Sequence, residues 1–351
     1  MTGFSSQRPL GASPAGLVPA RFGVRIAGTG SCLPDRVITN ADLTKVMDTT
    51  DEWIVQRTGI RERHIIDRDK GESTKSLCTV ALRRALAAAR IDAKELDLLI
   101  VGTICGEMAC PSVSCRVAAE VGAGTCGAFD ITAACCGFVY GMNVAHEMIK
   151  GGSYRTVAVV GCDTLTGNVR YETANRNIAI IFGDAAGAAI FRATDDPSKG
   201  IIAQAMHADG SGWEDLYIPR SITDIPEDQG RDPAKVNIIQ MNGKEVFRFA
   251  VSKFPQLIGQ TLEKAGLKPE DVALYICHQS NARILEAARE KYNIPREKMY
   301  VNIDRIGNTS AGSVPLCLDE LTRAGRVREG ERVMFVAFGG GLTWSASLWQ
   351  L

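Results

Sequence analysis

The feature of this sequence that most limits its possible folds is a repeat of the first half of the chain in the second half. Three segments recur in the same order, with apolar or small residues at the same places. The pairs are residues 89–102 with 265–278 and 156–161 with 332–337, at a shift of 176, and Cys135 and Gly137 with Ser310 and Gly312, at a shift of 175. This repeat indicates a tandem duplication of one folding unit.

Each copy alternates helical patterns with short apolar runs rich in β-branched residues, which are typical of buried parallel strands. We therefore expect an α/β fold built from two similar halves. If a pseudo-twofold axis relates the halves, equivalent loops of the two copies meet. The insert 208–235 is rich in glycine and proline, interrupts the pattern and is predicted to lie at the surface.

Charge and cysteine content exclude several classes of protein. The chain of 351 residues carries 40 basic and 40 acidic residues, so it has no general attraction to nucleic acid or to an anionic membrane. Its 11 cysteines include no CxxC pair and follow no secretory signal, which favours reduced thiols in the cytoplasm. Cys105, Cys110 and Cys115 are evenly spaced, but the histidines are dispersed. We interpret these cysteines as buried packing residues and predict no metal site.

Two terminal segments have their own patterns. Residues 1–22 contain no acidic residue and are predicted to form a flexible tail, with an organellar presequence as the alternative. Residues 333–351 are uncharged, but a run of three glycines, 339–341, divides them into two short apolar segments. A strand, a turn and a second strand fit this pattern better than a membrane helix.

The stretch DITAACCGFVYG, residues 130–141, places two adjacent cysteines where a predicted strand passes into a predicted helix. Gly151 and Gly152 then end that helix. A thiol on the first turn of a helix has its anion stabilised by about 0.3–1 kcal/mol, which lowers its pKa by about one unit at most. This effect alone is too small, so reaction of Cys135 needs a second group. His278 is the candidate.

His278 ends the predicted strand LYICH, at the kind of strand edge where α/β sites collect. Asn308 lies in the loop RIGNTSAGSVP, before another predicted helix. Taken singly, His278 could be a structural residue, and Asn308 could be part of a helix cap. A cysteine accepts an acyl group from another thiol almost isoenergetically, and an imidazole and a carboxamide can hold a thioester oxygen that becomes an enolate. Together the three residues favour thioester chemistry.

From about residue 23 to its C-terminus, the chain resembles the β-ketoacyl-acyl carrier protein synthase III enzymes of the thiolase superfamily. The matching motifs are TTDEWIVQRTGIRERHI (49–65), DITAACCGF (130–138), ICHQSNARI (276–284), DRIGNTSAGSVP (304–315) and FGGGLTW (338–344). The resemblance implies a homodimer and a five-layered αβαβα fold of two duplicated halves. Residues 23–196 would carry the nucleophilic cysteine, and residues 197–351 the histidine and the asparagine.

The resemblance also implies a role for each matching site residue. Cys135 would accept the acyl group, and His278 and Asn308 would stabilise the enolate. The N–H groups of Cys135 and Gly340 would form the oxyanion hole. Cys136 stands where the family commonly has a small residue, and we interpret it as a packing residue, with a redox partner as the alternative.

Other positions match family residues that contact the two substrates. Trp53 and Arg176, with Arg57 close by, correspond to the residues that hold the adenine of coenzyme A. Arg248 and Arg283 would dock an acidic carrier protein, although an ordinary solvated helix face is the alternative. The same alternative applies to the neighbouring basic residues Lys253, Arg289 and Lys291.

Cys110 stands where many relatives carry a phenylalanine that closes the acyl pocket from the neighbouring subunit, so we expect primers longer or more branched than acetyl to be accepted. The implied reaction is a decarboxylating condensation of acyl-CoA with malonyl-acyl carrier protein, which initiates type II fatty acid synthesis. It needs no cofactor, because the coenzyme A thioester is a substrate. A related acyltransferase or condensing enzyme of secondary metabolism, with a different acceptor, and a redox-sensing thiol protein are the alternatives.

Overall fold

The computed structural model describes residues 22–351 and contains two large β-sheets. The first sheet has the strand order β1 (Gly23–Cys32), β7 (Ala185–Thr194), β6 (Thr156–Asp163), β4 (Leu98–Gly102) and β5 (Gly127–Ile131). The second has the order β8 (Gly200–Ala208), β13 (Thr343–Gln350), β12 (Arg332–Gly339) and β11 (Leu274–Cys277). The predicted tail lies outside the described residues, except for Phe22.

Both sheets are mixed, although the sequence favours parallel ones. The pairs β4–β5, β4–β6 and β11–β12 are parallel, whereas the pairs toward β1 and β8 are antiparallel. The link between β12 and β13 shows one physical reason. It spans only residues 340–342, and so short a connection can join only antiparallel strands.

The structure confirms the duplication and corrects its register near the cysteines. A shift of 176 carries β6 onto β12, and the same shift carries the 3₁₀ turn Ala134–Cys136 onto the 3₁₀ turn Ser310–Gly312. The shift of 175 expected for this segment is therefore wrong. Cys135 corresponds to Ala311 and not to Ser310, because the offset stays constant through the turn.

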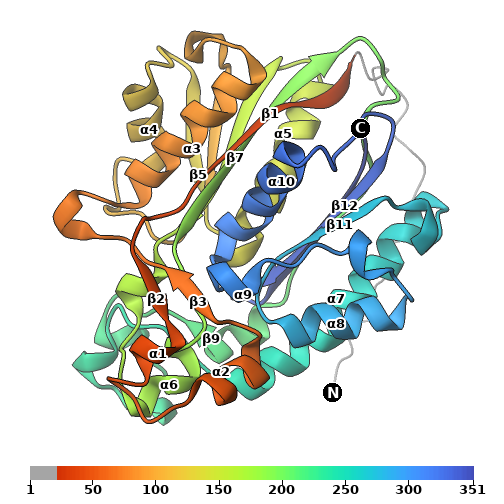
Figure 1. Ribbon diagram of the computed structural model, residues 1–351. Helices are drawn as coiled ribbons and strands as arrows, with labels where there is room; N and C mark the ends of the chain where they lie inside the picture. Colours follow the sequence, from red (N-terminus) through yellow and green to blue (C-terminus); the bar gives the residue numbers. More distant parts are fainter. Residues whose placement is uncertain (1–21) are drawn as a thin grey trace, which may run out of the picture.

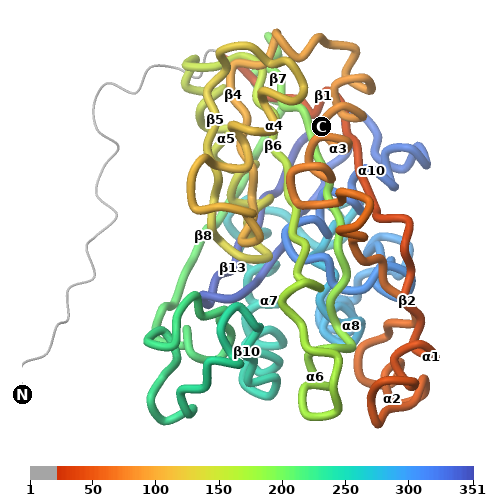
Figure 2. Tube along the Cα trace, turned by 90° about the vertical axis from the view of Figure 1, so that its left-hand side faces the viewer, coloured from red at the N-terminus to blue at the C-terminus, as the bar shows by residue number. Residues whose placement is uncertain are grey.

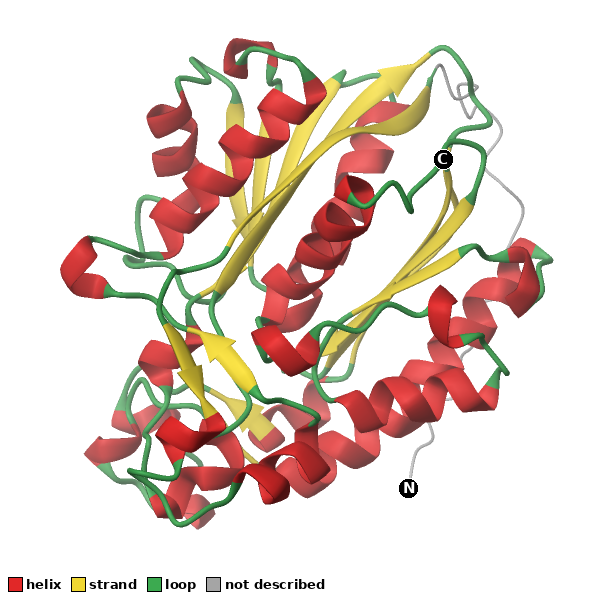
Figure 3. Ribbon diagram, viewed as in Figure 1, coloured by secondary structure: helices red, strands yellow, loops and turns green. Residues whose placement is uncertain are grey.

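Helices form three layers around the two sheets, as Figures 1 and 3 show. α3 (Thr74–Ala89) and α4 (Val113–Val121) cover the outer face of the first sheet, and α7 (Gly243–Ala265) and α8 (Ala282–Lys291) cover the outer face of the second. α5 (Gly137–Lys150) and α10 (Ser313–Arg323) lie between the sheets and contact both. The predicted five-layered αβαβα fold is confirmed.

Strand β6 shows how the sequence encodes these layers. All 8 of its residues are buried. Val157 and Val159 belong to the central core around α5 and α10, whereas Ala158 and Val160 belong to the outer core under α3 and α4. Because alternate residues of a strand face opposite sides, a strand with helices on both faces needs a continuous apolar run.

Most of the remaining short elements gather at one end of the two sheets, the lower end in Figures 1 and 2. They are β2 (Val37–Thr39), α1 (Asn40–Leu43), α2 (Asp51–Thr58), β3 (Glu62–His64), α6 (Arg176–Ala179), β9 (Leu216–Tyr217) and β10 (Gln240–Met241). The insert 208–235 is only partly the surface excursion that the sequence predicts. Its residues Leu216 and Ile218 pack in an apolar cluster with Leu165 and Phe182, so the insert covers this end of the molecule.

The structure also tests the predictions for the C-terminus and the cysteines. Residues 332–350 form two strands joined by a turn, as predicted, and no helix within residues 22–351 has the length and apolarity to cross a bilayer. Every cysteine is a free thiol. Cys110 and Cys115 are exposed and Cys105 is half-buried, so the prediction that all three are buried is wrong. They lie on α4 and on the loop before it, in the outermost layer, where a second covering layer is lacking in the described chain.

Candidate active site

Cys135 lies in a tight turn between β5 and α5. Ala134, directly before the cysteine, has a φ of 45°, in the left-handed region that non-glycine residues seldom adopt. The turn packs closely on β4, where a Cβ on Gly102 would lie 2.4 Å from the backbone of Gly137. The α-helix begins at Gly137, so both cysteines precede it instead of occupying its first turn. Cys136 is fully buried in the central core, as expected of a packing residue.

Desolvation dominates the electrostatics of Cys135. Burial raises the pKa of its thiol to about 12. The hydroxyl of Ser310 lies 3.3 Å from Sγ and acts in the opposite direction, lowering this pKa. The modest stabilisation expected from the helix N-terminus does not outweigh the loss of hydration. Cys135 is therefore a neutral thiol at neutral pH, and it has to lose its proton when it reacts.

His278 follows β11 and is buried, with an exposed fraction of 1%. Burial lowers the pKa of its imidazole to about 3, so the ring is neutral at physiological pH. Nδ1 lies 2.7 Å from the Oγ of Ser313, and this oxygen also accepts the N–H of Gln279. Because the Ser313 hydroxyl has no other acceptor within residues 22–351, we infer that it donates to Nδ1. The ring proton then lies on Nε2, and His278 is a hydrogen-bond donor.

Asn308 follows α9 (Ile303–Ile306) in a buried loop. Its backbone N–H donates to the carbonyl of Ile181 at 2.9 Å, and its carbonyl accepts the N–H of Gly183 at 3.0 Å. Its side-chain Oδ1 accepts the N–H of Ser310 at 2.9 Å. These bonds hold the loop and orient the carboxamide, so that the Nδ2 amino group is the donor left for a ligand.

Hydrogen bonds near the start of α10 bring the three predicted catalytic residues together. Ser310 contacts Cys135 through its hydroxyl and Asn308 through its N–H. Ser313, one turn later, contacts His278. One thiol from the first half of the chain is therefore linked, through the short segment that carries Ser310 and Ser313, to a carboxamide and an imidazole from the second half.

The backbone N–H groups of Cys135 and Gly340 donate to no acceptor within residues 22–351. The glycine run lies directly against the cysteine turn, because a Cβ on Gly339 would lie 2.7 Å from the backbone nitrogen of Cys135. Gly340 follows and packs beside Leu216 of the insert. Two unpaired N–H groups on adjacent segments suit an oxygen that develops negative charge. This arrangement is compatible with the predicted oxyanion hole.

Trp53, on α2, lies against two guanidinium groups. The Cζ atoms of Arg57 and Arg176 are 4.6 and 4.9 Å from the centre of its ring. Arg176 comes from α6 and also donates to the carbonyl of Asp48 at 2.6 Å. The structure thus brings together the three residues predicted to contact coenzyme A. An aromatic ring beside two cations suits a purine ring that carries anionic phosphates.

The two arginines predicted to dock a carrier protein lie near this cluster. Asn281 Nδ2 donates to the carbonyl of Arg57 at 2.9 Å and so joins the start of α8 to the end of α2. Arg283 follows on α8, and its guanidinium lies 5.0 Å from the ring of Phe247. Arg248 is the next residue of α7. Arg57 on α2, Arg283 on α8 and the turn of α7 that carries Phe247 and Arg248 therefore lie close to one another.

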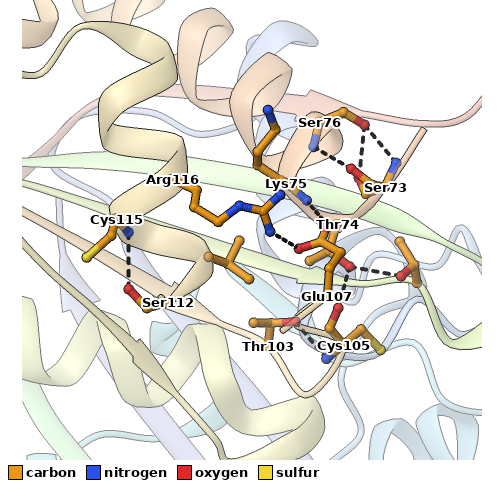
Figure 4. A network of polar contacts seen from close by, with 12 residues as sticks. Ser73, Thr74, Lys75, Ser76, Thr103, Cys105, Glu107, Ser112, Cys115 and Arg116 are labelled. Carbon is orange, nitrogen blue, oxygen red and sulfur yellow. Dashed lines mark hydrogen bonds and ion pairs between the residues drawn. The ribbon is translucent and has the colours of Figure 1, made fainter. Parts of the chain in front are cut away.

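Cys110 lies apart from this site, on the exposed loop before α4. Figure 4 shows how the loop is held: the N–H of Lys75 and the guanidinium of Arg116 donate to the carboxylate of Glu107, at 2.8 and 2.7 Å. No hydrogen bond or core cluster within residues 22–351 links Cys110 to Cys135. The predicted part in the acyl pocket therefore requires a second copy of the chain.

Sequence reasoning misses three buried polar residues of the site: Ser310, Ser313 and Asp163. The carboxylate of Asp163, at the end of β6, accepts the hydroxyl of Thr103 at 3.0 Å and the N–H of Ala311 at 3.3 Å. Their only signal in the sequence is their position, since each polar residue stands at the end of an apolar strand or at the start of a helix. The partners lie in other segments, so the sequence does not reveal their roles.

Two family models match this chain. Residues 129–210 match 3-Oxoacyl-[acyl-carrier-protein (ACP)] synthase III, and residues 262–351 match 3-Oxoacyl-[acyl-carrier-protein (ACP)] synthase III C terminal. The first match contains Cys135, and the second contains His278 and Asn308.

Relatives and solved structures cover nearly the whole chain. Beta-ketoacyl-[acyl-carrier-protein] synthase III of Caldanaerobacter subterraneus subsp. tengcongensis is 42% identical over 92% of this chain and 96% of its own length. The crystal structure of 3-oxoacyl-[acyl-carrier-protein] synthase III from Aquifex aeolicus has a TM-score of 0.86 and 41% identity, over 94% of this chain and 100% of its own. For the priming beta-ketosynthase from the R1128 polyketide biosynthetic pathway the TM-score is 0.85 and the identity 34%, over 96% of this chain and 99% of its own.

Proposed function

Because the chain belongs to the 3-oxoacyl-[acyl-carrier-protein] synthase III family, we propose that it condenses an acyl-CoA primer with malonyl-acyl carrier protein. The product is 3-ketoacyl-acyl carrier protein, the first elongation intermediate of type II fatty acid synthesis. The reaction has two halves, acyl transfer to the enzyme and decarboxylating condensation. Its only coenzyme is the coenzyme A of the substrate.

In the first half-reaction, the sulfur of Cys135 attacks the carbonyl carbon of acyl-CoA. A new thioester bond forms, and coenzyme A leaves as a thiolate that takes up the proton lost by the thiol. The N–H groups of Cys135 and Gly340 stabilise the carbonyl oxygen while it carries negative charge. Burial of the thiol keeps it protonated until this step.

In the second half-reaction, the malonyl group loses carbon dioxide, and the electron pair of the broken bond forms an enolate. The enolate oxygen accepts hydrogen bonds from Nε2 of His278 and Nδ2 of Asn308. The carbanion then attacks the acyl group on Cys135, and the sulfur leaves as a thiolate. The thiolate takes up one proton from solvent, which is the proton that decarboxylation of the malonyl carboxylate consumes overall. Neither donor has to act as a base, which agrees with a neutral imidazole whose pKa is about 3.

One observation carries this proposal: two serines, Ser310 and Ser313, contact all three reacting side chains from a single turn of the chain. Mass spectrometry after mixing with acyl-CoA tests it, and we expect an acyl adduct on Cys135. Addition of malonyl-acyl carrier protein should then release 3-ketoacyl-acyl carrier protein. Transfer only to another acceptor would favour an acyltransferase of secondary metabolism, and mixed disulfides alone would favour a thiol sensor.

The cluster around Trp53 is proposed to bind the adenine and phosphates of coenzyme A. Replacing Arg176 with alanine removes one cation beside the ring and is expected to raise the KM for acyl-CoA about tenfold, with little change in kcat. Arg192→Ala is a matched control, because both arginine side chains are 37% exposed and each pairs with one carboxylate. Equal KM values for the two variants in steady-state kinetics would contradict this assignment.

We propose that Cys110 lines the acyl pocket of a partner protomer and leaves room for bulky primers. Isobutyryl-CoA and octanoyl-CoA should therefore acylate Cys135 within about tenfold of the rate with acetyl-CoA. Cys110→Phe should slow octanoyl transfer at least about tenfold relative to acetyl transfer, because one methylene in a pocket is worth about 1–3 kcal/mol. Cys115→Phe, at the other exposed cysteine, is the control. A strict preference of the unmodified protein for acetyl-CoA would rule the idea out.

This role of Cys110 requires a homodimer, which we also propose. Two features support it. β5 is an edge strand, whose unpaired N–H and C=O groups can pair with another strand. Met108, on the loop that carries Cys110, is 46% exposed and offers apolar surface to a partner. We place the enzyme in the cytoplasm, where its cysteines would stay reduced.

A further inference from the structure

The duplication gives the cysteine turn a counterpart in the second half of the chain. Ala134 corresponds to Ser310, and both have a positive φ, 45° and 49°. Cys135 corresponds to Ala311, so the second turn repeats the backbone of the first without its nucleophile. The second turn nevertheless contacts the thiol of the first.

The two turns differ in what lies against them. In the second turn, the N–H of Ala311 donates to the buried carboxylate of Asp163 at 3.3 Å. In the first turn, the position that corresponds to Asp163 is Gly339, which has no side chain to accept a hydrogen bond from Cys135. The N–H of Cys135 therefore stays free, whereas the N–H of its counterpart is occupied.

Ser310 is held in one orientation toward the thiol. Its exposed fraction is 1%, and its N–H is bound to Oδ1 of Asn308 at 2.9 Å. Its positive φ restricts the backbone further. From this position its hydroxyl donates to Sγ of Cys135 at 3.3 Å. Burial raises the pKa of the carboxyl group of Asp163, and the Ser310 hydroxyl, which is also within its reach, acts in the opposite direction. Because a serine has one O–H hydrogen, the hydroxyl donates to only one of these two acceptors at a time.

We propose that Ser310 is a further catalytic residue, whose hydroxyl stabilises the sulfur of Cys135 whenever that sulfur is an anion. The inference rests on the proposed function. In acylation the sulfur loses its proton as the bond to the acyl carbon forms, and in condensation it leaves the acyl carbon as a thiolate before a proton returns. A hydrogen bond to an anion is stronger than one to a neutral thiol, so the hydroxyl favours both charged states. The second copy of the turn thus supplies a hydrogen-bond donor, the Ser310 hydroxyl, to the cysteine of the first copy.

Site-resolved alkylation of Cys135 by iodoacetamide at pH 8, followed by mass spectrometry of its peptide, measures the thiolate without any thioester. Ser310→Ala should slow alkylation about tenfold, which is one pKa unit. Acylation by acetyl-CoA should slow by a similar factor. Ala134 shows that alanine tolerates this backbone in the same kind of turn. Ser310→Gly, which adopts a positive φ readily, should give the same loss and guards against misfolding of the alanine variant.

Ser313→Ala is the matched control, because it removes a buried hydroxyl of the same segment that contacts His278 instead of Cys135. Its Cys135 should be alkylated within twofold of the original rate. Unchanged alkylation in both Ser310 variants, or an equal loss in Ser313→Ala, would overturn the assignment. If no acyl adduct forms but the Ser310 variants still lose alkylation, the proposed function fails and the contact between Ser310 and the thiol stands.

Discussion

Replacing Cys135 with alanine is expected to abolish acyl transfer, with a loss of at least about four orders of magnitude in condensation rate. The reason is that the hydroxyl of Ser310, 3.3 Å from the sulfur, is a much weaker nucleophile than the thiol it would have to replace. Removal of a catalytic nucleophile leaves only the contribution of binding and of the oxyanion hole. Mass spectrometry with acyl-CoA and a condensation assay with malonyl-acyl carrier protein measure the two losses separately.

Cys136→Ala provides a close control for this variant. Cys136 has the same side chain and is the next residue, but it is buried in the central core. Its replacement should cost stability and leave the acyl adduct on Cys135 intact. If the acyl adduct persists in Cys135→Ala, or is lost only in Cys136→Ala, then Cys135 is not the nucleophile.

Replacing Asn308 with alanine is expected to reduce decarboxylation of malonyl-acyl carrier protein by about 10²–10³, the usual effect of losing one donor to a developing oxyanion. His278 is neutral and supplies only one N–H, so it does not compensate for the lost amide. Acylation of Cys135 should fall less, because the oxygen in that step is held by backbone N–H groups. The remaining effect on acylation comes from Ser310, whose N–H loses its acceptor.

Release of carbon dioxide from labelled malonyl-acyl carrier protein and the rate of acyl-adduct formation, measured on the same preparation, separate these two effects. The ratio of the two rates serves as the internal control for protein quality. Decarboxylation at the original rate in Asn308→Ala would argue against the role of the carboxamide. An equal fall in both rates would indicate a general loss of site geometry.

Much of the fold was predictable from the chain alone. The repeat implies two similar halves, and the continuous apolar run of β6 implies a strand covered on both faces. The register of the repeat near Cys135 was not predictable from the sequence, because small residues such as alanine, serine and glycine match at a shift of 175 and at a shift of 176. The position of 3₁₀ turns and their positive φ values decides between them.

Candidate residues of the site were also partly predictable. Cys135, His278 and Asn308 stand at the ends of strands and in loops, where polar residues have few structural tasks. Ser310 and Ser313 stand in the same loop and helix start, but their partners come from elsewhere in the chain. Hydroxyl groups are common at helix starts as caps, so their sequence context does not separate a cap from a catalytic donor.

The sequence by itself therefore determines local features: where strands stop, where small residues permit a sharp turn, and which side chains can react. Folding decides which of these groups meet and what surrounds them. The packing of α5 and α10 between two sheets brings the two copies of the turn into contact, and burial moves the pKa of the thiol to about 12 and that of the imidazole to about 3. Both effects depend on residues that are distant in sequence, because hydrogen-bond partners and desolvation come from the groups that pack nearby in space.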